Sequence, residues 1–439
     1  MKRFLIHHYL IEVFHPLVQL TLIVGFLFIG LSFRFEIPRF DYWDIVFEST
    51  FVLQGEGLLM TRILEYLFSP VADQIMVLPK LTIFLTNHLA GYYFLELEII
   101  LSWLLLVIGY LMLLSIYSIP LTSWSNLKTD HKVKTVVCFA VYWWLVTLPS
   151  ITNNWFAIQY GIVLVTGIAA IYCFDRAKSA SLNLVYGYVW FCLCALSHGT
   201  GILLGPALAV WLYFRSSCPK LVIILILGTS LILVWLVWSK TQPSGVIDHS
   251  IVWSTTSLKY FMRVGTPYYW EQVIFIVVVL PAFVLTSWVF INNPSIEWRR
   301  VNTILIVWGL GVWVVTFYAR HEFQATANPH YVRFFVLLYL AGFMSLSTMK
   351  IWKGQKQIVI AISILMICIW AKGIDKGLYF TKGFLEENIR GYHSLLNDVG
   401  VENLETSKIY PLSQSRLTMI LIPRLVNYEP YGYRLLFRR

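Results

Sequence analysis

The sequence predicts an all-α polytopic membrane protein with about eleven transmembrane helices. Of its 439 residues, 58% are hydrophobic and 13% are charged, about half the charged share of an ordinary soluble domain. The apolar residues stand in continuous runs and do not alternate with the period of a membrane β-barrel. A chain of this composition cannot cover itself with polar groups in water, so we expect lipid to surround it.

Apolar runs mark the expected spans in order along the chain. With the N-terminus in the cytoplasm, each short inner connection is basic, whereas the short outer turns near 150–154 and 198–200 contain no Lys or Arg. Positive residues accumulate in cytoplasmic loops, which fixes the expected orientation and accounts for the net charge of +10 without a nucleic-acid partner. The runs lie near 10–33, 93–121, 135–149, 155–173, 183–197, 201–214, 221–239, 272–292, 302–319, 331–348 and 357–371.

The expected domains follow from these runs. Residues 1–372 form the transmembrane domain, and the polar residues 373–439 form a small lobe on the outer face. The first outer loop covers about 34–92 and contains two amphipathic stretches, 57–68 and 74–88. Each is too short or too charged to span, so we expect interfacial helices that lie in the plane of the membrane surface.

Two carboxylates open the first outer loop, directly after the first span. Asp41 and Asp44 enclose Tyr42 and Trp43, and their spacing puts them on one face of a helical turn. They are either a helix cap and a solvated charge, or a general base that removes a proton from a hydroxyl. A divalent cation is a third interpretation that we do not favour, because few further oxygen ligands are evident. We therefore expect no metal ion and no cofactor.

Cations stand at the outer ends of two late spans, against the positive-inside trend. Arg320 ends the ninth run, and Arg333 follows His330 and Tyr331 at the start of the tenth. Snorkelling towards lipid phosphates is one explanation. The other is recognition of a substrate phosphate, because a guanidinium pairs with two phosphate oxygens and keeps its charge at any working pH.

Two further candidate residues lie at outer ends of spans. His198 occupies the glycine-containing turn 197–201, either as a group that titrates near neutrality or as a hydrogen-bonded structural residue. Glu96 stands at the start of the second span, where acids commonly face a polar cavity.

These features resemble the GT-C class of polytopic glycosyltransferases. Asp41-Tyr42-Trp43-Asp44 resembles the Asp-x-Trp-Asp signature of one bacterial branch, and residues 197–206 are similar to its Ser-x-x-x-Gly-Leu-Leu-x-x-Pro stretch. Residues 320–331 resemble its Arg-rich segment, with His330-Tyr331 in place of Arg-Tyr. The chain departs from the branch at 71–75, where Val-Ala-Asp-Gln-Ile replaces His-Asn-Glu-His-Arg. Size and architecture are similar to serotype-converting glucosyltransferases that modify bacterial O-antigen.

The resemblance implies a multi-pass enzyme of the bacterial inner membrane, with its active site and C-terminal lobe in the periplasm. Such an enzyme moves a hexose, glucose for the serotype-converting group, from a polyprenyl-phosphate donor to a lipid-linked glycan such as the O-antigen of lipopolysaccharide. The expected catalytic residues are Asp41 and Asp44. The expected substrate-binding residues are Arg320, His330, Tyr331, Arg333, His198, Trp43 and Glu96.

Two other functions remain open at this point. A lipid-linked oligosaccharide flippase or exporter would need charged side chains along a path through the bilayer. An O-antigen polymerase or ligase is also polytopic and basic, but its large functional loop usually lies late in the chain, whereas here the longest internal outer loop is the first.

Overall fold

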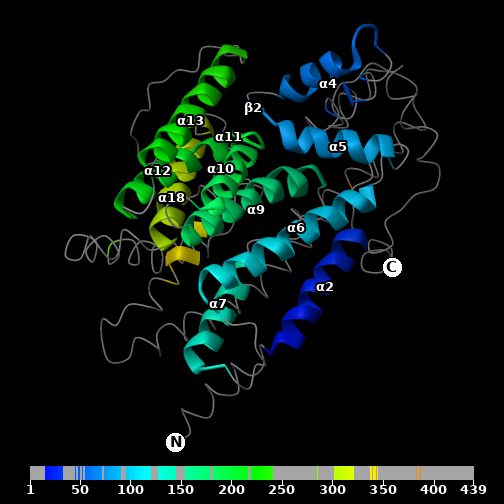
Figure 1. Ribbon diagram of the computed structural model, residues 1–439. Helices are drawn as coiled ribbons and strands as arrows, with labels where there is room; N and C mark the ends of the chain where they lie inside the picture. The colour runs from blue at the N-terminus through cyan, green and yellow to red at the C-terminus, as the bar shows by residue number, and fades with distance from the viewer. Residues whose placement is uncertain are drawn as a thin grey trace, which may run out of the picture.

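The described part of the protein is a bundle of helices with a short helical layer at one end (Figure 1). Of the expected features, the runs near 272–292, 331–348 and 357–371 and the C-terminal lobe lie outside the described residues, apart from isolated positions. The computed structural model describes residues 15–32, 45, 48–49, 52, 55–71, 74–89, 95–119, 127–144, 154–177, 181–215, 219–240, 284, 301–320, 337–338, 340–342, 344, 382 and 386.

The other apolar runs are helical, as the sequence predicts. The window Leu97–Ile116 of one helix and the window Lys220–Val237 of another are long and apolar enough to cross a membrane. The helices that correspond to these runs are α2 (Pro16–Ser32), α6 (Leu95–Ile116), α7 (Thr129–Trp144), α9 (Asn154–Arg176), α10 (Leu182–Ala195), α12 (Leu204–Arg215), α13 (Lys220–Lys240) and α18 (Val301–Arg320).

Helices α2 and α6 pack antiparallel, and aromatic side chains fill the space between them and α7. Trp103 Nε1 on α6 donates a hydrogen bond of 2.8 Å to the carbonyl of Ile23 on α2. The buried Trp143 of α7 stacks on Phe26, with ring centroids 5.9 Å apart, and meets Tyr142 edge to face. Such aromatic pairs add specific geometry to the burial of large apolar surfaces.

Basic residues gather at one end of the bundle. Helices α9 and α12 end there with Arg176 and Arg215, and α13 begins there with Lys220. Arg176 Nη2 donates to Ser115 Oγ at the end of α6 over 2.9 Å, and Arg215 Nη1 donates to the carbonyl of Phe174 over 2.7 Å. We call this the basic end, and the opposite end, where α2 and α10 end and α6 begins, the loop end.

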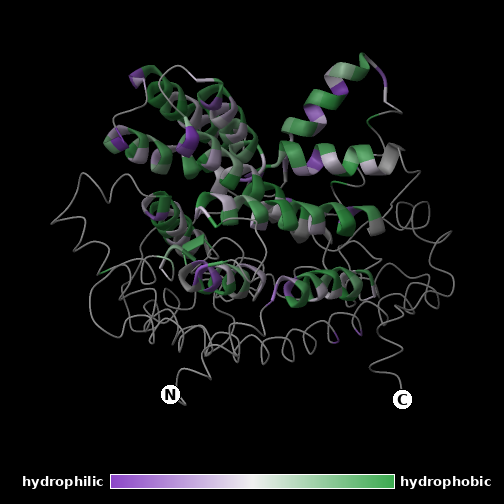
Figure 2. Cartoon of the chain, turned by 60° about the horizontal axis from the view of Figure 1, so that its bottom comes forward, coloured by the Kyte–Doolittle hydropathy of each residue, from purple (hydrophilic) through white to green (hydrophobic). Residues whose placement is uncertain are grey.

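Large apolar side chains remain exposed on the outside of the bundle. Along α13, Leu221, Ile224, Leu231, Ile232 and Trp235 are each at least 60% exposed. Figure 2 shows hydrophobic residues along most of the described helices. Soluble monomers rarely expose continuous apolar patches of this extent, so the surface of α13 is suited to contact with lipid.

The α10–α12 hairpin is shorter than its neighbour α9. Helix α10 has 14 residues and α12 has 12, so they are about 21 Å and 18 Å long. Helix α9 runs antiparallel to α10 and has 23 residues, or about 35 Å. Cys194 Sγ, near the end of α10, donates to the carbonyl of Val163, and α9 extends roughly 13 Å beyond Val163 towards the loop end. The turn of the hairpin is therefore recessed: it lies closer to the middle of the bundle than the loop end of α9 does.

Glycines allow this hairpin to close, which gives a test of the packing. A Cβ on Gly201 would lie 2.1 Å from the carbonyl oxygen of Cys194, whereas one on Gly228 of α13 would meet nothing within 4 Å. We expect Gly201→Ala to destabilise the protein by about 1–3 kcal/mol, because backbone must shift to admit the methyl group. Gly228→Ala, the matched control, should leave stability unchanged or raise it by up to ~1 kcal/mol. Thermal unfolding in detergent measures both, and equal melting temperatures would contradict the packing.

Candidate functional site

The described residues between 45 and 89, which we call the loop segment, form a compact unit at the loop end. It contains α4 (Leu59–Phe68), β1 (Pro70–Val71), β2 (Gln74–Ile75) and α5 (Val77–Leu89). Both expected amphipathic helices are present. The second begins at Val77 and not at 74, because Gln74–Ile75 pairs antiparallel with Pro70–Val71. Pro79 fits the first turn of α5, where a backbone N–H has no partner within the helix.

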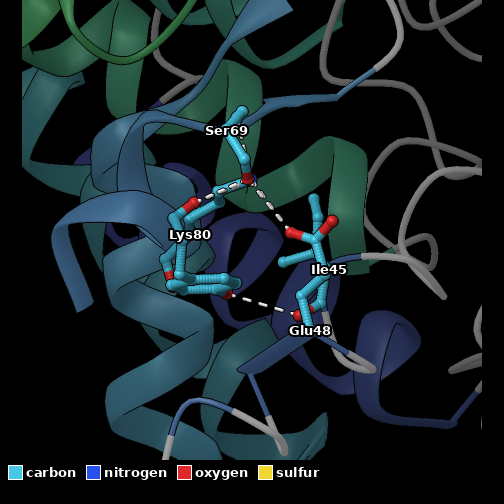
Figure 3. Close-up of polar contacts among 5 residues, drawn as sticks. Ile45, Glu48, Ser69 and Lys80 are labelled. Carbon is cyan, nitrogen blue, oxygen red and sulfur yellow. Dashed lines mark hydrogen bonds and ion pairs between the residues drawn. The ribbon is translucent and has the colours of Figure 1, made fainter. Parts of the chain in front are cut away.

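A fully buried ammonium group organises the loop segment (Figure 3). Lys80 Nζ on α5 donates to the carbonyls of Tyr66 and Ser69, each over 2.9 Å, and to the hydroxyl of Ser69. It also lies 3.3 Å from Oε2 of Glu48 and 5.0 Å from the centre of the Tyr66 ring. The two carbonyls belong to the C-terminal turn of α4, where backbone oxygens lack partners and the helix dipole favours a cation.

Tyr66 links the same cluster to the start of the loop segment. Its hydroxyl lies 3.3 Å from the carbonyl oxygen of Ile45 and 3.2 Å from that of Lys80. Burial raises the pKa of Tyr66 well above its ordinary value, and the negative charges of Glu48 and Glu98 raise that pKa further. The hydroxyl therefore stays protonated and remains a donor to these carbonyls.

An acidic side chain lies where the loop segment meets the bundle. Glu98, in the first turns of α6, is fully buried, and Thr86 Oγ1 of α5 donates to its Oε1 over 3.4 Å. Glu96, the acid that the sequence singles out, stands two residues earlier. It belongs to α6, but its side chain is outside the described residues.

The loop segment is docked on the turn of the α10–α12 hairpin. Val77 N, at the start of α5, donates to the carbonyl of Leu196 over 2.8 Å. On the other side of this turn, Gly199 N donates to Oε1 of Gln74 over 3.4 Å. Because the turn is recessed, the strand β2 and the start of α5 reach into the bundle.

His198 stands in this turn and has a structural role. It is 3% exposed and precedes the short helix α11 (Gly199–Ile202). Its Nδ1 accepts a hydrogen bond of 3.1 Å from Thr200 N and lies 2.9 Å from Thr200 Oγ1. Trp308 Nε1 of α18 donates to the carbonyl of Thr200 over 3.0 Å. Of the two interpretations that the sequence leaves open, this geometry agrees with the hydrogen-bonded turn residue.

Arg320 is the last residue of α18, at the end that points away from the basic end. Tyr117 OH donates to Oδ1 of Asn302 at the start of α18 over 2.9 Å, next to the basic end. Arg320 follows about 27 Å further along the helix axis. Its side chain and the residues Asp41, Trp43, Asp44, His330, Tyr331 and Arg333 lie outside the described residues.

The Lys80 cluster is not apparent from the sequence. There, Lys80 is a lone cation between Pro79 and Leu81 within an amphipathic stretch. Its partners Glu48 and Ser69 stand 32 and 11 residues away, and nothing in the spacing relates them. Only the fold brings the three together.

Neither the described side chains nor comparisons with known proteins identify the chemistry of the loop end. Within the described ranges, no three His, Cys, Asp or Glu side chains are close enough to hold a metal ion, and Asp41 and Asp44 are not part of those ranges. No protein-family model matches the chain, and no curated protein or solved structure matches it either. The resemblance to the GT-C class thus rests on short motifs and the order of elements.

The Lys80 cluster predicts a stability effect. Lys80→Met keeps an unbranched side chain, one heavy atom shorter, but removes the donor from two carbonyls at the end of α4, so we expect a loss of about 1–3 kcal/mol. Lys220→Met, at an exposed position of the basic end, is the control and should have no effect. Melting temperatures in detergent, with limited proteolysis of the loop segment, measure the difference. A Lys80→Met protein as stable and protease-resistant as the wild type would show that the ammonium does not hold the segment.

Proposed function

We propose that the protein is a glycosyltransferase that moves a hexose from a polyprenyl-phosphate donor to a lipid-linked glycan. The observation that carries this proposal is the position of the loop segment. It packs on the loop end of the bundle, the same end towards which α18 runs to Arg320. The loop segment and the C-terminal end of α18 thus lie at the same end of the bundle, which supports a donor and acceptor site shared between them.

Membrane embedding is part of the proposal. It is supported by the two helices long enough to span and by the exposed apolar face of α13. The charge distribution orients the chain, because Arg176, Arg215 and Lys220 share one end and basic loops stay in the cytoplasm. We therefore propose a bacterial inner-membrane protein with its basic end in the cytoplasm, and with the loop end and the lobe 373–439 in the periplasm.

The proposed reaction uses charges of both signs at the loop end. The donor phosphate lies against Arg320 and against His330 or Arg333, and these cations stabilise the negative charge that grows on the departing phosphate. Asp41 or Asp44 removes the proton from an acceptor hydroxyl. The acceptor oxygen forms a bond to the anomeric carbon, and the bond from that carbon to the phosphate oxygen breaks. Direct attack by a separate acceptor inverts the configuration at the anomeric carbon.

Transport is a weaker candidate because of where charges lie in the bundle. In α6, α9, α12, α13 and α18, the charged residues fall within the first or last two turns of the helix. A flippase would need polar or charged side chains along a path through the bilayer. An O-antigen polymerase or ligase remains an alternative that no described contact favours.

The general base is tested with conservative variants. We expect Asp41→Asn or Asp44→Asn to lower the rate of hexose transfer by at least about 100-fold, because an amide cannot take up the proton. Transfer of a radiolabelled hexose from polyprenyl phosphate to the lipid-linked acceptor in membranes measures the rate. Wild-type rates for both single variants and the double variant, with the protein present in the membrane, would contradict the catalytic assignment.

The phosphate site is tested at Arg320. Arg320→Gln removes a charge-assisted contact to the donor, so we expect KM for the donor to rise by roughly 10- to 100-fold. Lys220→Gln, at the opposite end of the bundle, is the matched control and should leave KM unchanged. If Arg320→Gln retains the wild-type KM, Arg320 does not bind the donor phosphate.

A further inference from the structure

The chain that follows the two candidate carboxylates is fixed in place. Asp44 is bonded to Ile45, which is helical and fully buried, as is Ser49 one turn later. Val52, a further turn on, is 6% exposed. Ile45 and Val52 pack in the apolar cluster of the loop segment together with Tyr66 and side chains of α5.

Polar contacts at Ile45 and at Glu48 orient this short helical stretch. The hydroxyl of Tyr66 holds the carbonyl of Ile45. One turn further, Oε2 of Glu48 receives hydrogen bonds from Lys80 Nζ at 3.3 Å and from Ser69 Oγ at 3.1 Å (Figure 3). Together they fix the position of Ile45, the residue after Asp44, and of Glu48 one turn later.

Glu48 is more exposed to solvent than its partner Lys80, so its loss should affect the orientation of the turn more than the stability of the fold. The Lys80 side chain is 0% exposed, and carbonyls of the protein already accept from its ammonium. The Glu48 side chain is 46% exposed, so water can solvate the carboxylate if the contact is lost. An ion pair that is half open to solvent contributes little to folding free energy. Loss of the contact should therefore loosen the turn locally while the protein stays folded.

We propose that Glu48 and Lys80 are positioning residues, whose contact sets the direction of the chain that carries Asp41 and Asp44. This inference rests on the proposed function, in which one of those carboxylates is the general base. A base must lie within hydrogen-bond reach of the hydroxyl it deprotonates, and displacement by about 1 Å can cost roughly 100-fold in rate. Glu48 acts through this placement and does not touch the reacting atoms.

The experiment compares Glu48→Ala with Glu48→Gln and a matched control in the full-length protein in membranes. We expect Glu48→Ala to lower kcat by roughly 10- to 100-fold, with KM for the donor within about twofold of wild type. Glu48→Gln keeps an acceptor oxygen and should recover part of the loss. The pH profile of kcat should keep its shape, because the base itself is unchanged. Glu65→Ala, an exposed glutamate on α4, should match the wild type.

Hydrogen exchange of the amides in 45–52 gives a readout that does not depend on activity. We expect faster exchange in Glu48→Ala than in the wild type or in Glu65→Ala. Wild-type kcat in Glu48→Ala would overturn the positioning role, and so would a lower kcat without faster exchange, because Glu48 would then act directly in the chemistry. These results are distinct from failure of the proposed function, in which the Asn variants at 41 and 44 would themselves be active.

Discussion

The structure depends on the contact between the loop segment and the hairpin turn at Leu196. The backbone hydrogen bond from Val77 to Leu196 contributes about 0.5–1.5 kcal/mol to stability. Apolar packing contributes more, because Leu236 and Val237 of α13 pack with Leu196 against the buried cluster of the segment. A fully buried side chain of this size contributes about 1.5–3 kcal/mol, and each of these partly buried ones contributes a fraction of that. The apolar contacts therefore hold the two parts together, and the hydrogen bond sets their register.

For the buried cation inside this cluster, Lys80, polar contacts matter more than apolar packing. Removing the ammonium of Lys80 from water is costly, and its attraction to Glu48 does not by itself offset that cost. What makes the arrangement tolerable is the end of α4, whose last carbonyls require donors in any case. The ammonium supplies the donors that these carbonyls lack, and the carbonyls supply acceptors for the ammonium. Specificity follows, since the carbonyls accept from this ammonium when α4 and α5 are in one arrangement.

The sequence predicts the described helices well but few of the contacts at the loop end. Long apolar runs and basic inner loops determine where α6, α9 and α13 lie, because both signals are local. The turn around His198 is recognisable from its glycines, but its role is not, since Gln74 and Trp308 become neighbours of the turn only through the fold. The contact between Glu48 and Lys80 joins residues 32 positions apart, and no periodicity in the sequence encodes it.

The short α10–α12 hairpin has a consequence for the membrane itself. Helices of about 21 Å and 18 Å fall well below a hydrocarbon core of about 30 Å. In the proposed setting, this hydrophobic mismatch is relieved by local thinning of the bilayer or by the polar chain of β2 that occupies the missing depth. Where the bilayer thins, headgroups and water come down towards the hairpin turn on this side of the protein. A membrane-anchored substrate can then present its polar head below the surrounding lipid plane without lifting its chain out of the bilayer.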